Sequence, residues 1–96
     1  MTYQVRFTPG AIQDLSRLDK TVAQRILSKI KWLSENFDDL TPERLSGNLR
    51  GLLKLRIGSY RVIYTLIHTV SPATNESERV ITIHLVGHRR EIYKEK

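Results

Sequence analysis

Hydrophobic and polar residues alternate most clearly on either side of Gly58-Ser59, within the stretch from Leu53 to Leu66. The apolar members of this alternation are Leu53, Leu55 and Ile57 before the turn, and Val62, Tyr64 and Leu66 after it. A period of two that is interrupted by a short Gly-Ser turn is typical of a β-hairpin. The pattern therefore predicts two antiparallel strands with one apolar face directed toward a core.

The other face of this hairpin carries basic residues. Lys54 and Arg56 stand between the apolar positions of the first strand, and Arg61 begins the second strand. No acidic residue occurs between Arg44 and Asn75. Because a solvated hairpin usually mixes both charge signs, this face is predicted to bind an anion.

The first third of the chain alternates once and then changes to helical spacing. Tyr3 to Phe7 predicts a strand, and Thr8-Pro9 has the residue types that begin a helix. Asp19 is a second candidate cap, before a longer helix that ends near Asn36. The apolar positions at helical spacing are Ala11, Leu15 and Leu18, and then Val22, Ile26, Ile30 and Leu33.

The remaining segments complete the topology. The polar stretch from Asp38 to Asn48 is predicted to be a loop, and Ser71 to Ser77 a hairpin connection. The last strand is expected from Arg79 to Val86, and a tail follows Gly87. Its apolar positions Ile81, Ile83 and Leu85 should share one face. The predicted order is β-α-α-β-β-β. We expect an α+β fold with two N-terminal helices packed on one face of a largely antiparallel four-stranded sheet.

Length and charge indicate one basic domain over residues 1–96. The chain has 40% hydrophobic residues, enough for one modest core, and a formal net charge of +6. Such a balance favours a polyanionic partner, with nucleic acid first. A membrane surface and an acidic protein are the alternatives, although no amphipathic helix carries a broad basic face.

The absence of cysteine excludes disulfides, thiolate zinc sites and thiol nucleophiles. The N-terminal segment lacks an apolar signal core, and no apolar run has transmembrane length. We therefore expect a cytoplasmic protein that does not associate with a membrane. The three histidines lack the spacing of metal ligands, and no glycine loop for phosphate is present. No metal or other cofactor is expected.

Residue types that commonly contact phosphate groups follow the last strand. His88, Arg89, Arg90 and Tyr93 follow one another closely in the tail. If the last two strands pair, this tail should lie beside Arg61, and cations, an imidazole and a phenol would surround one groove. Arginine suits phosphate because its guanidinium forms paired hydrogen bonds and remains protonated.

Two stretches, LSGNLRGLLKLRIGSYRVIYTL and VITIHLVGHRREIY, resemble the RelE/ParE superfamily of bacterial toxins, most closely its RelE branch. FTPGAIQDLSRL is also similar to that family's first strand and helix, so the resemblance covers nearly the whole chain. It implies an endoribonuclease that cleaves mRNA in the ribosomal A site, without a metal, through attack of the RNA 2′-hydroxyl on the adjacent phosphate. It also implies inhibited translation and a cognate antitoxin that is usually acidic.

The resemblance also implies site residues. By position, the catalytic set is Lys54, Arg61, Arg89 and Tyr93, and the expected RNA-binding set is Arg50, Arg56, His88 and Arg90. The RelE pattern has another lysine where this chain has Leu52, and His88 could supply proton transfer instead. The alternative functions are a ParE-like, non-enzymatic inhibitor of DNA gyrase and a binding domain without catalysis. ParE-like members generally lack the set of Arg61, Arg89 and Tyr93.

Overall fold

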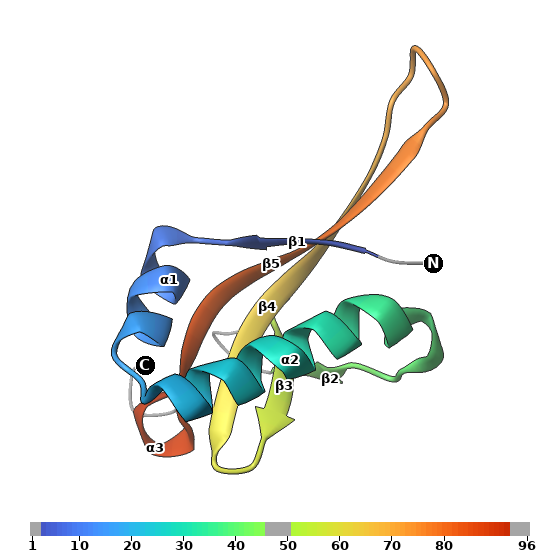
Figure 1. The fold of residues 1–96 in the computed structure, drawn as a ribbon. Helices are drawn as coiled ribbons and strands as arrows, with labels where there is room; N and C mark the ends of the chain where they lie inside the picture. Colours follow the sequence, from blue (N-terminus) through green and yellow to red (C-terminus); the bar gives the residue numbers. More distant parts are fainter. Residues whose placement is uncertain (1–2, 46–50, 93–96) are drawn as a thin grey trace.

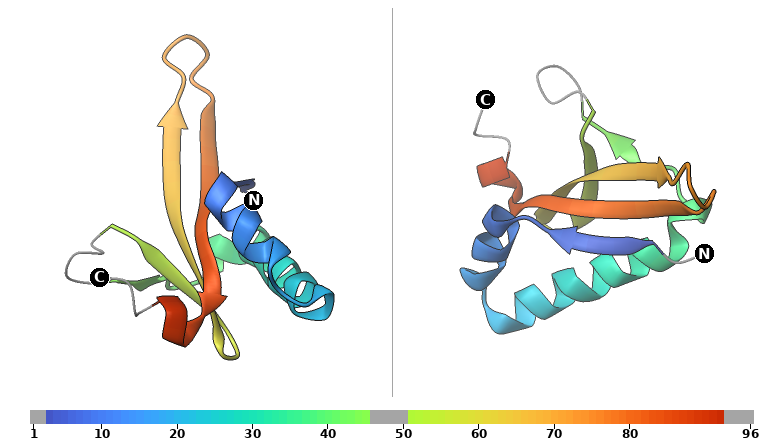
Figure 2. Two further views of the ribbon diagram at one scale, coloured as in Figure 1. Left: turned by 90° about the vertical axis from the view of Figure 1, so that its left-hand side faces the viewer. Right: turned by 90° about the horizontal axis from the view of Figure 1, so that it is seen from above.

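The computed structural model describes residues 3–45 and 51–92 of the chain. A strongly curved sheet has α1 and α2 on one face (Figures 1 and 2). The elements in chain order are β1 (Gln4–Phe7), α1 (Pro9–Ser16), α2 (Lys20–Asn36), the 3-10 helix η1 (Phe37–Asp39), β2 (Glu43–Arg44), β3 (Leu53–Ile57), β4 (Tyr60–Val70), β5 (Ser77–His88) and α3 (Arg89–Ile92).

The sheet has the strand order β1-β5-β4-β3-β2. β1 is parallel to β5, and the other neighbouring strands are antiparallel. The predicted α+β class and the helix-covered, largely antiparallel sheet are therefore confirmed. The expected count of four strands is wrong, because β2 adds a fifth.

β2 lies inside the segment from Asp38 to Asn48 that was expected to be a loop. Glu43 pairs with Lys54, Arg44 pairs with Leu53, and the Leu45 amide donates to the Leu52 carbonyl at 3.0 Å. A strand of two exposed residues has no apolar alternation to reveal it. This strand comes from pairing with the edge of β3, a tertiary contact that the local pattern does not contain.

The two N-terminal helices, α1 and α2, begin where the sequence predicts. The Thr8 hydroxyl accepts a hydrogen bond from the Ala11 amide at 3.1 Å, and Pro9 is the first residue of α1. Asp19 precedes α2, but its side chain makes no capping hydrogen bond. The Ala23 amide donates instead to the Asp19 backbone carbonyl at 2.8 Å.

The core lies between the two N-terminal helices and the sheet, as predicted. Ile26 and Ile30 of α2 are almost completely buried, and so are Val62 and Tyr64 of β4. Leu55 and Val22 are partly buried at the margin. The buried cluster comprises Tyr3, Ala11, Ile26, Ile30, Leu33, Phe37, Leu53, Val62, Tyr64, Ile81, Ile83 and Val86.

The pairing of β4 with β5 contains a β-bulge at His84. Tyr64 pairs with Ile83, whereas the preceding Ile63 pairs with Leu85, so His84 is an extra residue on β5. Its ring nitrogen Nε2 lies 2.9 Å from the hydroxyl of Thr65. The bulge reverses the alternation of every residue that follows it on this strand.

This reversal corrects the predicted faces of the last strand. Leu85 was expected beside Ile81 and Ile83, but the residue is 45% exposed, and Val86 is buried in the core instead. The apolar alternation runs through the bulge without a break, so the sequence alone does not reveal the change. The same reversal determines which face carries His88.

β4 and β5 continue past the rest of the sheet as a long hairpin arm (Figure 1). The arm extends from about Leu66 to Arg79, and its turn is closed by hydrogen bonds between Ser71 and Glu76 at 2.7 Å and between Asn75 and Ser71 at 2.8 Å. Asn75 has a positive φ of 61°, which asparagine tolerates better than most residues. The predicted hairpin connection between these strands is therefore confirmed.

Candidate nucleic-acid interface

Three basic side chains share the face of the β3–β4 hairpin that points away from α2. Arg56 and Arg61 are direct cross-strand partners, and Lys54 is two residues from Arg56 on the same face. Leu53 and Leu55, the residues that alternate with them, pack toward the core. The two strands thus bring together cations that the sequence separates by up to seven positions. We call Lys54, Arg56 and Arg61 the cation face.

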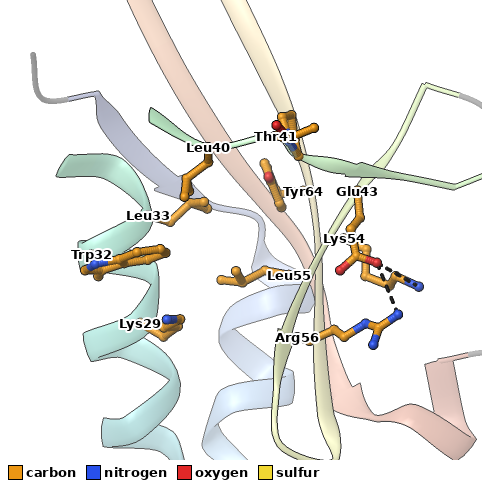
Figure 3. Close-up of a pocket in the computed structure, with 11 residues that line it drawn as sticks. Lys29, Trp32, Leu33, Leu40, Thr41, Glu43, Lys54, Leu55, Arg56 and Tyr64 are labelled. Atoms are coloured by element: carbon orange, nitrogen blue, oxygen red, sulfur yellow. Dashed lines mark ion pairs between the residues drawn. The ribbon is translucent and has the colours of Figure 1, made fainter. Parts of the chain in front are cut away.

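A carboxylate lies against this face. Oε1 of Glu43 is 3.3 Å from Nη2 of Arg56 and 3.8 Å from Nζ of Lys54 (Figure 3). The sequence stretch without acids begins at Arg44, immediately after this glutamate. The absence of acids from the hairpin sequence therefore does not extend to its surroundings in the structure, because β2 brings Glu43 to the cations.

Arg61 is held in place by hydrogen bonds to the backbone. Its side chain is on the predicted face, opposite Val62 and Tyr64, but the residue is only 8% exposed. Nη1 donates to the carbonyl oxygens of Gly58 at 2.8 Å and Tyr60 at 2.9 Å. Within the described residues, its Nε is buried without a hydrogen-bond partner. The guanidinium thus stabilises the β3–β4 turn as well as adding charge to this face.

The tail begins beside the same turn. Gly87 is the cross-strand partner of Arg61, and the Arg89 amide donates to the Ser59 carbonyl at 2.8 Å. α3, which starts at Arg89, lies on the side of the sheet opposite α1 and α2 (Figure 2). Arg89 and Arg90 are both exposed. The predicted proximity of the tail to Arg61 is therefore confirmed for the start of α3.

His88 is on the other face of the sheet. It pairs with Tyr60, and the two rings meet edge to face with their centroids 5.6 Å apart. Its Nδ1 accepts a hydrogen bond from the Arg90 amide at 3.2 Å. The expectation that the imidazole would share one groove with Arg61 is wrong, because the bulge at His84 turns His88 away. Two other expected site residues, Arg50 and Tyr93, lie outside the described part of the chain.

Comparison with known proteins places this architecture in a family. The family model described as the ParE toxin of the type II toxin–antitoxin system parDE matches residues 5–93. The chain belongs to this toxin family. A RelE-like toxin protein from Escherichia coli is 30% identical over 94 residues, covering 93% of the chain and 85% of the relative.

Solved structures agree with this assignment. The toxin is similar to a chain of the RelBE2 toxin–antitoxin complex from Mycobacterium tuberculosis, with 26% identity, a TM-score of 0.71 and 93% of each chain covered. It is also similar to a chain of the RelE–RelB complex from Pyrococcus horikoshii, with 28% identity and a TM-score of 0.59. That match covers 93% of the toxin and 97% of the archaeal chain. The toxin therefore has the RelE/ParE fold of type II toxin–antitoxin systems.

A pocket of about 230 Å³ lies between α2 and β3 of the toxin, next to the cation face (Figure 3). Trp32 of α2 lines it and remains 38% exposed, with Nζ of Lys29 3.8 Å from the centre of its ring. The full lining is Lys29, Trp32, Leu33, Leu40, Thr41, Pro42, Glu43, Lys54, Leu55, Arg56 and Tyr64.

Tyr64 is part of the core and has an altered acidity. Burial, and after it the negative charge of Glu43, raises the pKa of the Tyr64 phenol to about 12. The hydroxyl therefore stays protonated at neutral pH. This agrees with the prediction that Tyr64 packs in the core and does not belong to the anion site.

Two kinds of feature are absent from the toxin's described residues. No group of three or more histidine or carboxylate side chains is arranged to hold a metal ion there. No helix in the described ranges is long and apolar enough to cross a membrane.

Proposed function

We propose that the toxin is an endoribonuclease that cleaves mRNA in the ribosomal A site and so inhibits translation. The observation that supports this proposal is the concentration of arginine and lysine around one turn of the sheet. Arg56 and Arg61 are cross-strand partners, and the helix that carries Arg89 begins at a hydrogen bond to the same turn. Cations at this density suit the phosphates of a single RNA strand.

The proposed reaction is an internal transfer at phosphorus. The RNA 2′-oxygen attacks the adjacent phosphorus, the bond from phosphorus to the 5′-oxygen breaks, and a 2′,3′-cyclic phosphate and a 5′-hydroxyl form. The 2′-hydroxyl loses one proton and the leaving oxygen gains one. We assign charge neutralisation at the pentavalent phosphate to Lys54, Arg61 and Arg89, and proton transfer or orientation of the RNA to Tyr93. Arg50, Arg56 and Arg90 are proposed to contact the RNA outside the scissile bond.

His88 has a different proposed role. Its ring packs against Tyr60, and its Nδ1 accepts the amide of Arg90 at the start of α3. Both contacts fix the position at which α3 leaves the sheet. We therefore propose that His88 positions Arg89 and Arg90, and not that it transfers a proton to the RNA.

A cognate antitoxin is the proposed protein partner. The M. tuberculosis and P. horikoshii relatives were solved in complexes of this kind, the second with RelB. A chain with a net charge of +6 favours a partner segment that is acidic where it meets the toxin. We also propose that the toxin acts in the cytoplasm, where translating ribosomes are found.

Inhibition of DNA gyrase without enzymatic activity is the second candidate, because the matching family model is that of ParE toxins. One experiment separates the two activities. The toxin is expressed briefly, 5′ ends of cellular mRNA are mapped by primer extension, and purified toxin is added to a gyrase supercoiling assay. New 5′ ends within translated codons, with supercoiling unchanged, are the expected result. Inhibited supercoiling without new 5′ ends would replace the ribonuclease by the gyrase inhibitor.

A further inference from the structure

Glu43 is the one described carboxylate that forms ion pairs with the cation face. The pairing register places it directly across from Lys54, and a single carboxylate oxygen approaches both Lys54 and Arg56. Backbone pairing in β2 sets the position of the Glu43 main chain, so the carboxylate stays within reach of the two cations. A carboxylate in such a place makes the kind of contact that a phosphate oxygen makes.

The ion pair between Glu43 and Arg56 is also easy to displace. The side chains of Glu43 and Arg56 are 47% and 59% exposed, respectively, whereas that of Lys54 is 15% exposed. Pairs with this exposure are weak, since water screens the charges and both side chains lose freedom when they pair. An RNA phosphate has the charge and the acceptor oxygens to compete with a carboxylate for these two cations.

We infer that Glu43 is an internal counter-ion that occupies the place of an RNA phosphate on Lys54 and Arg56 and must be displaced when RNA binds. This inference rests on the proposed function, because it takes RNA as the polyanion. Glu43 then acts through the two cations as a positioning and specificity residue. It weakens binding to any RNA strand, so firm binding needs further contacts, such as those available when mRNA is held on a ribosome.

The test is the affinity of purified toxin for a fluorescein-labelled oligouridylate, measured by anisotropy over a range of KCl concentrations. Glu43→Gln keeps the size of the side chain and removes its charge. Removal of a unit charge about 6 Å from a phosphate in water should tighten binding about threefold at low salt. The logarithm of the affinity should also fall more steeply with the logarithm of salt, by up to about 0.7 in slope, because one more cation is freed for counter-ion release.

Glu76→Gln is the matched control. Glu76 is exposed near the tip of the hairpin arm, far from β2 (Figure 1), and its substitution changes the net charge by the same amount. Glu76→Gln should leave the salt dependence of the affinity unchanged, and the affinity itself almost unchanged. Glu43→Asp should bind like the parent toxin, since it keeps the charge. In an Arg56→Gln background, Glu43→Gln should give a clearly smaller gain, because part of its target has been removed.

Three results would overturn the inference. The first is an equal effect of Glu43→Gln and Glu76→Gln, which would mean that only net charge matters. The second is a full gain in the Arg56→Gln background. The third is a result in which Glu43→Gln changes the binding of poly-glutamate but not the binding of oligouridylate. That result would assign these cations to an acidic polypeptide. The assay uses neither ribosomes nor cleavage, so failure of the ribonuclease proposal is measured separately by the primer-extension experiment.

Discussion

Arg61 combines a buried guanidinium with a place in the proposed site. The alternation of the sequence was sufficient to predict its face, but the partners of its side chain were not predictable. Nη1 donates to backbone carbonyls of the neighbouring turn, and the residue faces Gly87, which contributes no side chain on that face. These partners depend on turn geometry and strand register, and neither can be read from residue types.

Substitution of Arg61 should therefore affect both stability and activity. Arg61→Ala should lower the free energy of unfolding by about 1–3 kcal/mol, because two turn carbonyls lose a donor. It should also slow mRNA cleavage by about 10²–10³. Arg89→Ala is the comparison, since Arg89 is exposed and should lose activity with an unchanged melting temperature. Single-turnover cleavage on programmed ribosomes and thermal melting measure the two effects. An unaltered melting temperature in Arg61→Ala would show that its turn contacts do not stabilise the toxin.

Tyr93 provides a separate test of the chemistry. Tyr93→Phe retains the ring and removes the hydroxyl, so it should slow cleavage with little change in ribosome binding if the phenol transfers a proton or orients the RNA. A ring that only stacks on a base would tolerate phenylalanine. Full cleavage activity in both Tyr93→Phe and Arg61→Ala would contradict the ribonuclease assignment.

Because of Tyr64, the free energy of unfolding of the toxin should fall at high pH. Its pKa in the folded state, about 12, is above the ordinary value of 10.0, so the unfolded chain loses the phenol proton first. The stabilisation is complete below pH 10 and is lost as pH rises toward 12, by about 1.4 kcal/mol per pH unit. Urea unfolding at several pH values should show this decline, and Tyr64→Phe should reduce it. Some decline should remain, because the hydrogen bond to Asp38 raises the pKa of Tyr3 as well. An identical decline in Tyr64→Phe would assign the effect to other groups.

At the scale of elements, the sequence was sufficient to predict helices and strands with a strong apolar periodicity. It did not reveal features that depend on pairing between distant segments. The two N-terminal helices and the β3–β4 hairpin were predictable because each contains several turns or repeats of its own apolar pattern. β2 and the bulge at His84 were not predictable, since both depend on pairing with a neighbouring strand: β2 with β3, and β5 with β4. The candidate site shows the same division. Lys54, Arg56 and Arg61 were predicted to share a face, whereas the approach of Glu43 and the turning away of His88 follow from pairing.

The packing of α2 on the sheet can be tested with two adjacent residues. Ile26 is fully buried, whereas Leu27 is 41% exposed. Ile26→Ala should lower the free energy of unfolding by about 2–5 kcal/mol, because it leaves a cavity in the core. Leu27→Ala removes a side chain of similar size from the same helix and should have a much smaller effect. Equal losses in urea unfolding for the two variants would contradict the observed orientation of α2.

For the whole molecule, the net charge of +6 should govern how quickly an acidic partner arrives. The proposed antitoxin should associate fast at low ionic strength and more slowly as salt screens the attraction. Stopped-flow mixing of purified toxin and antitoxin over a range of KCl concentrations measures this association rate. A rate that does not change with salt would count against electrostatic steering by the toxin.

The bulge at His84 also determines where the chain can change in length. Deletion of His84 would remove the extra residue, so Leu85 would still pair with Ile63 and every residue up to His88 would keep its face. If His84 were instead retained and paired with Ile63, the register would shift by one residue: Leu85 would enter the core, Val86 would leave it, and the imidazole of His88 would move to the face of Arg61. An insertion in the hairpin arm would merely lengthen an exposed turn. Whether His84 is bulged or paired therefore decides which of two surfaces the same side chains form at this end of β5.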